Sequence, residues 1–182
     1  MPGYMGKNLW VNLTTGEIRS EAFDEKLYRN FIGGYGIGAR IIYSRQKAGA
    51  DPLGPDNILG FTTGPLTGTV PFGSRYTVIA GRSPLTGGWA DANSGGEWGP
   101  TLKFAGYDNA FFTGTAQKPV YLLVTESHAE LRDASHLWGK DSYVTENMLQ
   151  AEYGRQVQVS CIGQSGEKLS FISAVITRRG AA

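Results

Sequence analysis

Cysteine is almost absent from this sequence of 182 residues, because Cys161 is the only one. A single cysteine excludes a disulfide framework and a C-x-x-C metal pair. The N-terminus also lacks the basic start and apolar stretch of a signal peptide, and together these features predict a cytoplasmic location. Cys161 lies between Ser160 and Ile162 with no basic neighbour to lower its pKa, so we expect a buried and unreactive thiol.

Long apolar runs and an excess of one charge are missing as well. No run approaches the roughly 18 residues that a membrane helix needs, and the formal net charge is +1 with both signs scattered along the chain. These features predict neither a membrane span nor a nucleic-acid-binding surface. With 41% hydrophobic and 18% charged residues the composition is globular, and residues 1–182 are predicted to form one compact domain.

Patterns of a self-contained catalytic centre are not found either. His128 and His136 have no acidic or cysteine partner at metal-ligand spacing, so both are expected to be structural. The phosphate-binding loop of ATP-using enzymes has no match. Residues 34–39 fit the dinucleotide-binding pattern, but a helical segment rather than a buried strand precedes them, and tight helix packing is the favoured interpretation.

Glycine, in contrast, is abundant, with 26 in 182 residues. This is roughly twice its ordinary usage, and many of the glycines cluster in residues 63–73, 82–88 and 92–96, between predicted strands. Because glycine has no side chain, such loops let the main chain touch a ligand directly. A turn-rich β protein without a ligand is the alternative interpretation.

The predicted elements occur in a similar order in two halves of the chain. The first half has a hairpin over residues 8–23, helices over 24–30 and 37–46, and strands over 57–61 and 75–80. The second half has strands over 120–124 and 129–132, a helix over 141–153, a strand over 156–162, a glycine loop over 163–166 and a strand over 169–176. The segment between them, 97–114, is too apolar for a linker and is predicted to be core.

This order indicates a weak internal duplication. Residues 11–19 recur as 124–132, which is a spacing of 113 residues (124 minus 11), although hairpin-plus-helix units also recur by chance. We therefore predict an α+β fold of two pseudo-symmetric halves, related by a pseudo-twofold axis, that together form a cofactor-binding base. Two similar glycine loops facing one surface suit a ligand with two similar parts.

Two residues next to the glycine loops are candidates for ligand binding. Arg75 starts a predicted strand, where its guanidinium can fork to phosphate oxygens beside main-chain N–H groups. Asn93 begins the run Asn93-Ser94-Gly95-Gly96, which offers oxygen atoms and a close main chain, and oxygen ligands suit a Mg²⁺ ion that bridges phosphates. Together the loops indicate a phosphorylated organic cofactor.

Six runs in order resemble the N-terminal domain of the aldehyde ferredoxin oxidoreductase family, nearly from end to end of the chain. They are Gly64-Pro-Leu-Thr-Gly-Thr69, Gly73-Ser-Arg-Tyr76, Arg82-Ser-Pro-Leu-Thr-Gly87, Ala92-Asn-Ser-Gly-Gly96, Leu102-Lys-Phe-Ala-Gly-Tyr-Asp108 and Arg132-Asp-Ala-Ser-His-Leu-Trp-Gly139. The resemblance implies a base that carries two pterin dithiolenes, which jointly hold one tungsten (or molybdenum) atom, with Mg²⁺ bridging the pterin phosphates.

The resemblance also assigns roles to individual residues. Arg75 resembles the arginine that contacts the pterin, and Asn93 resembles the residue whose main chain binds Mg²⁺, with Ser94, Gly95 and Gly96 beside it. Ala181 and Ala182 resemble the second cofactor loop, where the main-chain carbonyl of Ala181 is the matching Mg²⁺ ligand. The register of this loop is open by one residue, since the arginine that precedes it in the family falls on Arg179 or Gly180.

The activity implied by the resemblance is oxidation of an aldehyde to a carboxylic acid, with electrons leaving through a 4Fe-4S cluster to ferredoxin or an electron-transfer subunit. The cluster's cysteines belong to later domains of the family's longer chains, so the missing C-terminal domains are expected partners and this part alone is expected to be inactive. A homo-oligomer remains an option. Two alternatives stay open: a relative with another reaction, such as a benzoyl-coenzyme A reductase-type subunit, and a non-enzymatic pterin-binding module.

Overall fold

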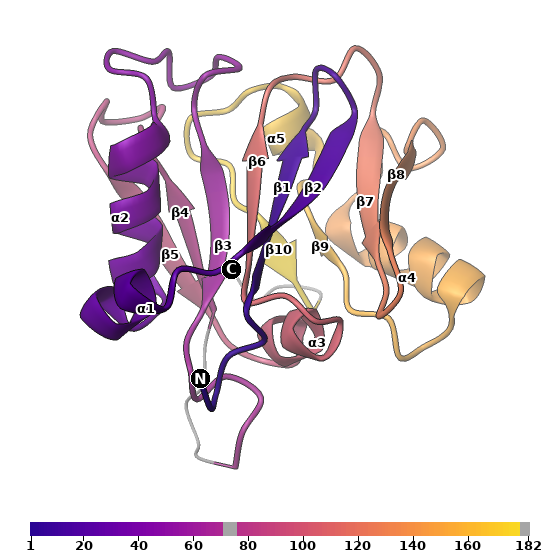
Figure 1. Ribbon diagram of the computed structural model, residues 1–182. Coiled ribbons are helices and arrows are strands. Elements are labelled where there is room, and N and C mark those ends of the chain that lie inside the picture. Colours follow the sequence, from indigo (N-terminus) through magenta and orange to yellow (C-terminus); the bar gives the residue numbers. More distant parts are fainter. Residues whose placement is uncertain (71–75, 179–182) are drawn as a thin grey trace.

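The structure, a computed structural model, describes residues 1–70 and 76–178 and has the predicted α+β architecture (Figure 1). The strands are β1 (Lys7–Asn12), β2 (Glu17–Ala22), β3 (Leu59–Thr63), β4 (Tyr76–Ala80), β5 (Ala90–Ser94), β6 (Asn109–Thr113), β7 (Val120–Val124), β8 (Ala129–Asp133), β9 (Ser160–Cys161) and β10 (Ile176–Thr177). The helices are α1 (Glu25–Phe31), α2 (Tyr35–Arg45), α3 (Trp98–Phe104), α4 (Ser142–Tyr153) and α5 (Gln164–Glu167).

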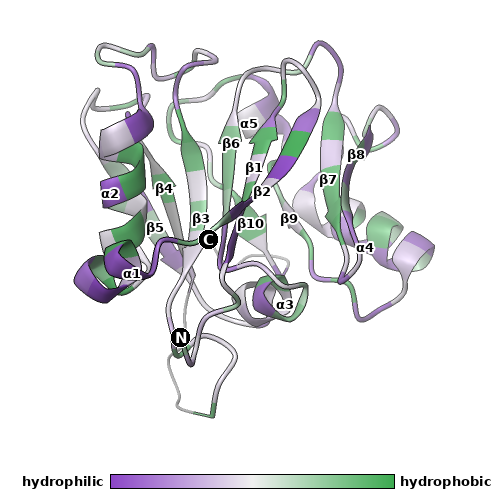
Figure 2. Cartoon of the chain, in the orientation of Figure 1, coloured by the Kyte–Doolittle hydropathy of each residue, from purple (hydrophilic) through white to green (hydrophobic). Residues whose placement is uncertain are grey.

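The largest sheet in the described part of the chain has the strand order β2-β1-β6-β3-β4-β5. Strand β6 lies at its centre, parallel to β1 and antiparallel to β3, and its Asn109 and Phe111 are fully buried. This strand belongs to the apolar segment 97–114, so the prediction that this segment is core is confirmed. The outer strand β2 is mostly hydrophilic, and only its residues Ile18 and Glu21 are partly buried, because it lies at the edge of the sheet. In Figure 2 its purple and green bands mark its hydrophilic and hydrophobic residues.

Both faces of this sheet are covered, and successive residues of β1 point to opposite faces. Trp10 packs with Ile37 and Ile41 of α2 on one face. Its neighbours Leu9 and Val11 belong to the cluster on the other face, which includes Leu102 of α3 and apolar side chains of the β7–β8 hairpin. The sheet is therefore an internal layer, and its two ends are where its loops gather.

The β7–β8 hairpin forms a further layer, and α4 packs on its outer side. Tyr121 of the hairpin contacts the cluster that includes Leu137 and Leu149. The predicted helix over 141–153 is confirmed as α4, and Asp141 caps it by accepting a hydrogen bond of 2.8 Å from the main-chain N–H of Val144. The helix ends at Gly154. The predicted first helix is confirmed in the same way by the Asp24 cap of α1.

Two strands predicted in the second half are wrong in extent. Of the predicted strand 156–162 only β9 is a strand, and of 169–176 only Ile176 belongs to one, β10. The intervening glycine loop forms the short helix α5, and Leu169 then has a positive φ of 57° that interrupts extended structure. The alternation of residue types in 156–162 and 169–176 did not make them strands, because most of these residues have no partner strand in the described structure. The opposite error occurs in the first half, where the predicted turn 92–96 begins inside strand β5.

The proposed match between the two hairpins is also off by one residue. The hairpins close with the pairs Asn12↔Glu17 and Val124↔Ala129, so equivalent residues are 112 apart (124 minus 12) rather than 113. A shift of one residue exchanges the two faces of a strand, so the similarity of residues 11–19 to 124–132 is not a structural equivalence. Superposition of the two halves about a pseudo-twofold axis stays a prediction.

Candidate functional site

Two of the three predicted glycine loops meet at one end of the six-stranded sheet, whereas the third, residues 82–88, joins β4 to β5 at the opposite end. Strands β3, β4 and β5 are antiparallel neighbours, and the register places Thr63 opposite Tyr76 and Tyr76 opposite Ser94. Residues 64–70, which follow β3, and residues 95–97, which follow β5, therefore emerge at the same end. Figure 1 shows this end at the bottom of the view, beside α3 and the N-terminus. We call it the glycine-loop end.

Helix α3 supports these loops from one face of the sheet. Its Trp98 ring lies 4.6 Å from the ring of Tyr76 and 5.1 Å from the ring of Phe61, measured between centroids. On the other face the Gly33–Gly34 turn approaches the start of the first loop, and a Cβ atom on Gly33 would lie only 2.7 Å from the carbonyl oxygen of Thr63. The beginning of the loop at residue 64 is thus held between two packed elements.

A buried ion pair lies at the same end. The Lys103 ammonium donates hydrogen bonds to the carbonyl oxygens of Gly3 (2.5 Å) and Gly64 (2.9 Å). Its Nζ lies 3.9 Å from the carboxylate of Asp108, which accepts a 2.7 Å hydrogen bond from the N–H of Gly6. Burial lowers the pKa of Lys103, and the negative charge of Asp108 opposes this shift. The pair joins the N-terminal segment to the first glycine loop through charge-assisted hydrogen bonds.

Asn93 and Ser94, the last residues of β5, are held on opposite faces of the sheet. The Asn93 side chain donates a hydrogen bond to the hydroxyl of Tyr35 at the start of α2. The buried Ser94 hydroxyl lies 3.0 Å from that of Thr177 in β10. The side chains of both residues are therefore engaged within the protein.

Gly95 and Gly96 continue this segment on the surface. No described atom lies within 4 Å of the place where a side chain on Gly95 would begin. Gly96 has a φ of +81°, which favours glycine, and a Cβ atom there would lie 2.7 Å from Cδ of the Arg178 side chain. The segment 93–96 therefore meets the end of the described chain at residues 177 and 178.

Of the residues predicted to bind the cofactor, Asn93, Ser94, Gly95 and Gly96 lie together at the glycine-loop end. Arg75, Ala181 and Ala182 lie outside the described residues, so their positions stay predictions. Sequence reasoning missed Lys103, although it belongs to one of the six runs that resemble the family. It also missed Thr177 and Tyr35, for which the sequence contains no local signal.

The other candidate groups lie elsewhere. Cys161 is half-buried rather than buried, and burial, with Glu146 and Asp141 nearby, raises its pKa to about 11, which agrees with an unreactive thiol.

Within the described residues the histidines offer no metal site. Nε2 of His128 lies 3.4 Å from the Glu130 carboxylate. Nevertheless, no group of three His, Cys, Asp or Glu side chains suited to a metal occurs between residues 1 and 70 or 76 and 178. None of the described helices is long and apolar enough to cross a membrane.

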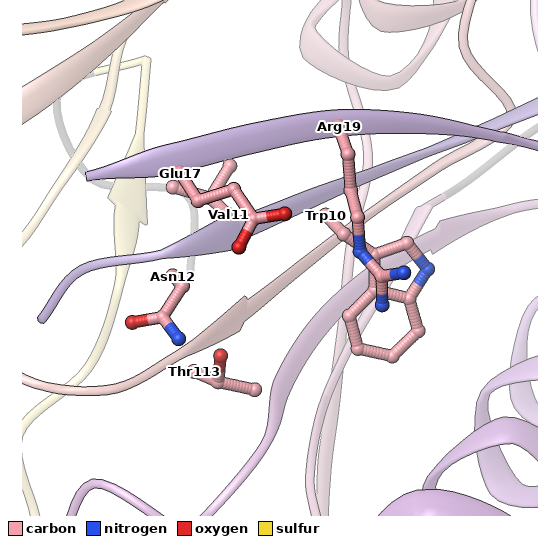
Figure 3. A pocket seen from close by; sticks show the side chains of 6 residues that line it. All are labelled: Trp10, Val11, Asn12, Glu17, Arg19 and Thr113. Atoms are coloured by element: carbon pink, nitrogen blue, oxygen red, sulfur yellow. The ribbon is translucent and has the colours of Figure 1, made fainter. Parts of the chain in front are cut away.

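A small hollow of about 220 Å³ lies at the opposite end of the sheet (Figure 3). Its lining residues are Trp10, Val11, Asn12, Glu17, Arg19 and Thr113. Thr113 ends β6 and Asn12 ends β1, and both strands run away from the glycine-loop end. The hollow contains none of the predicted site residues.

Two glycine-rich loops at one end of the sheet of an α+β domain are typical of a domain that brings its main chain close to a ligand. The particular family follows from comparison with known proteins. Residues 8–182 match the family described as aldehyde ferredoxin oxidoreductase, N-terminal domain. The chain belongs to this family, as its six sequence runs predicted.

Similar proteins share the whole of this domain. The tungsten-containing aldehyde ferredoxin oxidoreductase of Pyrococcus horikoshii is 46% identical, and that of Pyrococcus furiosus 43% identical, each over 97% of this chain and 29% of the relative. The solved active site complex BamBC of benzoyl coenzyme A reductase, in complex with 1,5-dienoyl-CoA, matches with a TM-score of 0.95 and 36% identity, over 99% of this chain and 28% of that one. The chain thus spans less than a third of the length of these relatives.

Proposed function

We propose that this chain is the cofactor-binding domain of a tungsten-containing oxidoreductase that oxidises aldehydes to carboxylic acids. The observation that carries the proposal is the convergence of residues 64–70, 93–96 and 176–178 at the glycine-loop end. Family membership supports it, because the similar Pyrococcus proteins are named as tungsten-containing aldehyde ferredoxin oxidoreductases.

The described residues fit a bis-pterin cofactor with a bridging Mg²⁺. Gly95 leaves open space where other residues carry a side chain, so a ligand can reach the main chain there. The Asn93 amide is bound by Tyr35, which agrees with a role for Asn93 through its main-chain carbonyl. In the proposed site Asn93 and Ala181 bind Mg²⁺, Arg75 binds pterin phosphate oxygens, and Ser94, Gly96 and Ala182 line the cofactor.

The bound tungsten, or molybdenum, would supply the redox chemistry, and this domain would position the cofactor and its phosphates. The proposed acceptor is ferredoxin or an electron-transfer subunit, reached through a 4Fe-4S cluster. Such a cluster needs four ligands, whereas this chain has only Cys161. The cluster ligands would therefore come from the part of the relatives' length that this chain does not span.

The test is to express the natural gene with tungstate and measure tungsten, pterin and magnesium in the purified polypeptide. We expect one tungsten and two pterins per polypeptide, and aldehyde-dependent reduction of ferredoxin. Arg75→Ala should lower the occupancy per folded protein, whereas the matched control Arg132→Ala, on the surface of β8, should leave it unchanged. Equal occupancy in both variants would show that Arg75 has no role in binding.

A benzoyl-coenzyme A reductase-type subunit is the second candidate, favoured by the similarity to BamBC. Both candidates would use the same cofactor-binding base, so the substrate separates them. Activity with benzoyl-CoA or a dienoyl-CoA and none with aldehydes would select the second candidate. Bound pterin without turnover of either class would instead indicate a binding module.

A further inference from the structure

The end of β5 is attached to the rest of the protein from both faces of the sheet. β5 is one of the two edge strands of the six-stranded sheet, and the end of such a strand is ordinarily among the first parts of a sheet to open. Here Asn93 binds Tyr35 of α2 on one face, and Ser94 binds Thr177 of β10 on the other. These attachments immediately precede the open main chain of Gly95.

The contact between Ser94 and Thr177 is a buried hydrogen bond between segments distant in sequence. Their relative exposures are 5% and 1%, and their hydroxyl oxygens are 3.0 Å apart. Strand β10 is in turn paired with β9, where Thr177 lies opposite Ser160. The hydrogen bond therefore joins the sheet of the first half to the small sheet of the second half.

Arg178 adds a second contact between the same two segments. Its own φ of +46° is unusual for a residue other than glycine, and its side chain lies against Gly96. Such a backbone conformation persists when the surrounding structure holds it, and it is often found at ligand sites.

We propose that Ser94 and Thr177 are positioning residues, whose hydrogen bond holds the end of β5, and with it residues 93–96, in a fixed place against β10. Ser94 directly follows Asn93 and precedes the open main chain of Gly95, so the bond lies beside the proposed Mg²⁺ ligand Asn93. A site arranged before binding keeps its ligand longer, because less order is lost on association. This inference rests on the proposed function.

The experiment measures how quickly the purified, loaded, full-length protein loses pterin and magnesium in a buffer containing a chelator, well below its unfolding temperature. The variants are Ser94→Ala, Thr177→Val and the double substitution, each of which removes the hydrogen bond. Thr177→Ser keeps a hydroxyl at the same place. Ser160→Ala is the matched control, because its buried hydroxyl has no hydrogen-bond partner among the described residues.

We expect Ser94→Ala and Thr177→Val each to speed the loss about tenfold, as for one lost buried hydrogen bond. The double variant should be no faster than the singles, and Thr177→Ser and Ser160→Ala should match the wild type. Wild-type retention in both single variants, equally fast loss in Ser160→Ala, or independent effects in the double variant would overturn the positioning role while leaving the proposed function intact. A wild-type protein without pterin would overturn both.

Discussion

The glycine-loop end and the outer surface of the β7–β8 hairpin both carry ionisable side chains joined by hydrogen bonds, but only the second is open to water. The side chains of Lys103 and Asp108 are 5% and 2% exposed. Those of Arg132 and Glu130, which pair at 2.6 Å on the hairpin, are 40% and 39% exposed. Water and salt screen the shorter, exposed pair, whereas loss of one partner of the buried pair would leave an uncompensated buried charge.

The comparison extends to the uncharged groups around each pair. Near the buried pair, the Tyr28 hydroxyl donates a 2.6 Å hydrogen bond to Asn8, and the Asn109 amide donates one of 2.7 Å to the same oxygen. Near the exposed pair, Arg132 donates to the hydroxyl of Tyr153, which lies 2.6 Å from that of Tyr121. The side chains of the first network are buried, so water cannot take the place of a lost hydrogen-bond partner there. In the second network Arg132 is 40% exposed, so water can do so.

The largest effect is expected from Asp108→Ala. The substitution leaves the Lys103 charge buried without its counter-ion and removes the acceptor for the Met5 and Gly6 N–H groups. We expect the free energy of unfolding, measured in urea, to fall by about 3–5 kcal/mol. Replacing Lys103 by Met in the same chain should restore part of the loss. A fall below about 1 kcal/mol would mean that the buried pair is no more important than a surface pair.

Tyr28→Phe should have the next largest effect, because it removes a buried hydroxyl and keeps the ring. We expect a loss of about 1–3 kcal/mol, and no change in Tyr43→Phe, the control at a residue that is 85% exposed. Burial, with the nearby Asp108 charge, raises the pKa of Tyr28 above the ordinary tyrosine value of 10.0. The unfolded chain therefore loses this proton first, and stability should decline as pH rises above about 10 in the wild type more than in Tyr28→Phe.

Gly96→Ala tests the contact between the glycine-loop end and the end of the described chain. Both the φ of +81° and the approach of Arg178 oppose a side chain, so a loss of about 1–2 kcal/mol is expected. Gly139→Ala is the control, because Gly139 has a similar φ of +78° but nothing within 4 Å. Equal losses in the two variants would mean that backbone strain, and not Arg178, explains the effect.

The smallest effect is expected from Arg132→Ala, within the range of ordinary surface substitutions at neutral pH. Hydrogen bonds from Arg132 and His128 lower the pKa of Glu130 below the ordinary glutamate value of 4.5. The stability from this group is present above that value and is lost as pH falls through the lowered pKa. Wild type and Arg132→Ala should therefore converge in acid unfolding, and a gap that widens toward low pH would contradict this account.

Much of the fold was predictable where the signal is local. The capping residues Asp24 and Asp141 and the terminal Gly154 lie within a few residues of the groups they satisfy. The turn at Ser127-His128 was predictable for the same reason. The candidate segment 93–96 was found because glycines and an asparagine are visible as a run, but the residues that hold this segment were not.

The sequence by itself determined the family, the α+β class, the start of α1 at its Asp24 cap, the end of α4 at Gly154 and the presence of glycine-rich loops. Only the tertiary structure decided that β9 and β10 are short, that Lys103 is buried beneath the first loop, and that Ser94 meets Thr177 across 83 residues. The reason is physical: a cap or turn is stabilised by its immediate neighbours, whereas burial and strand pairing depend on which distant segment supplies the partner.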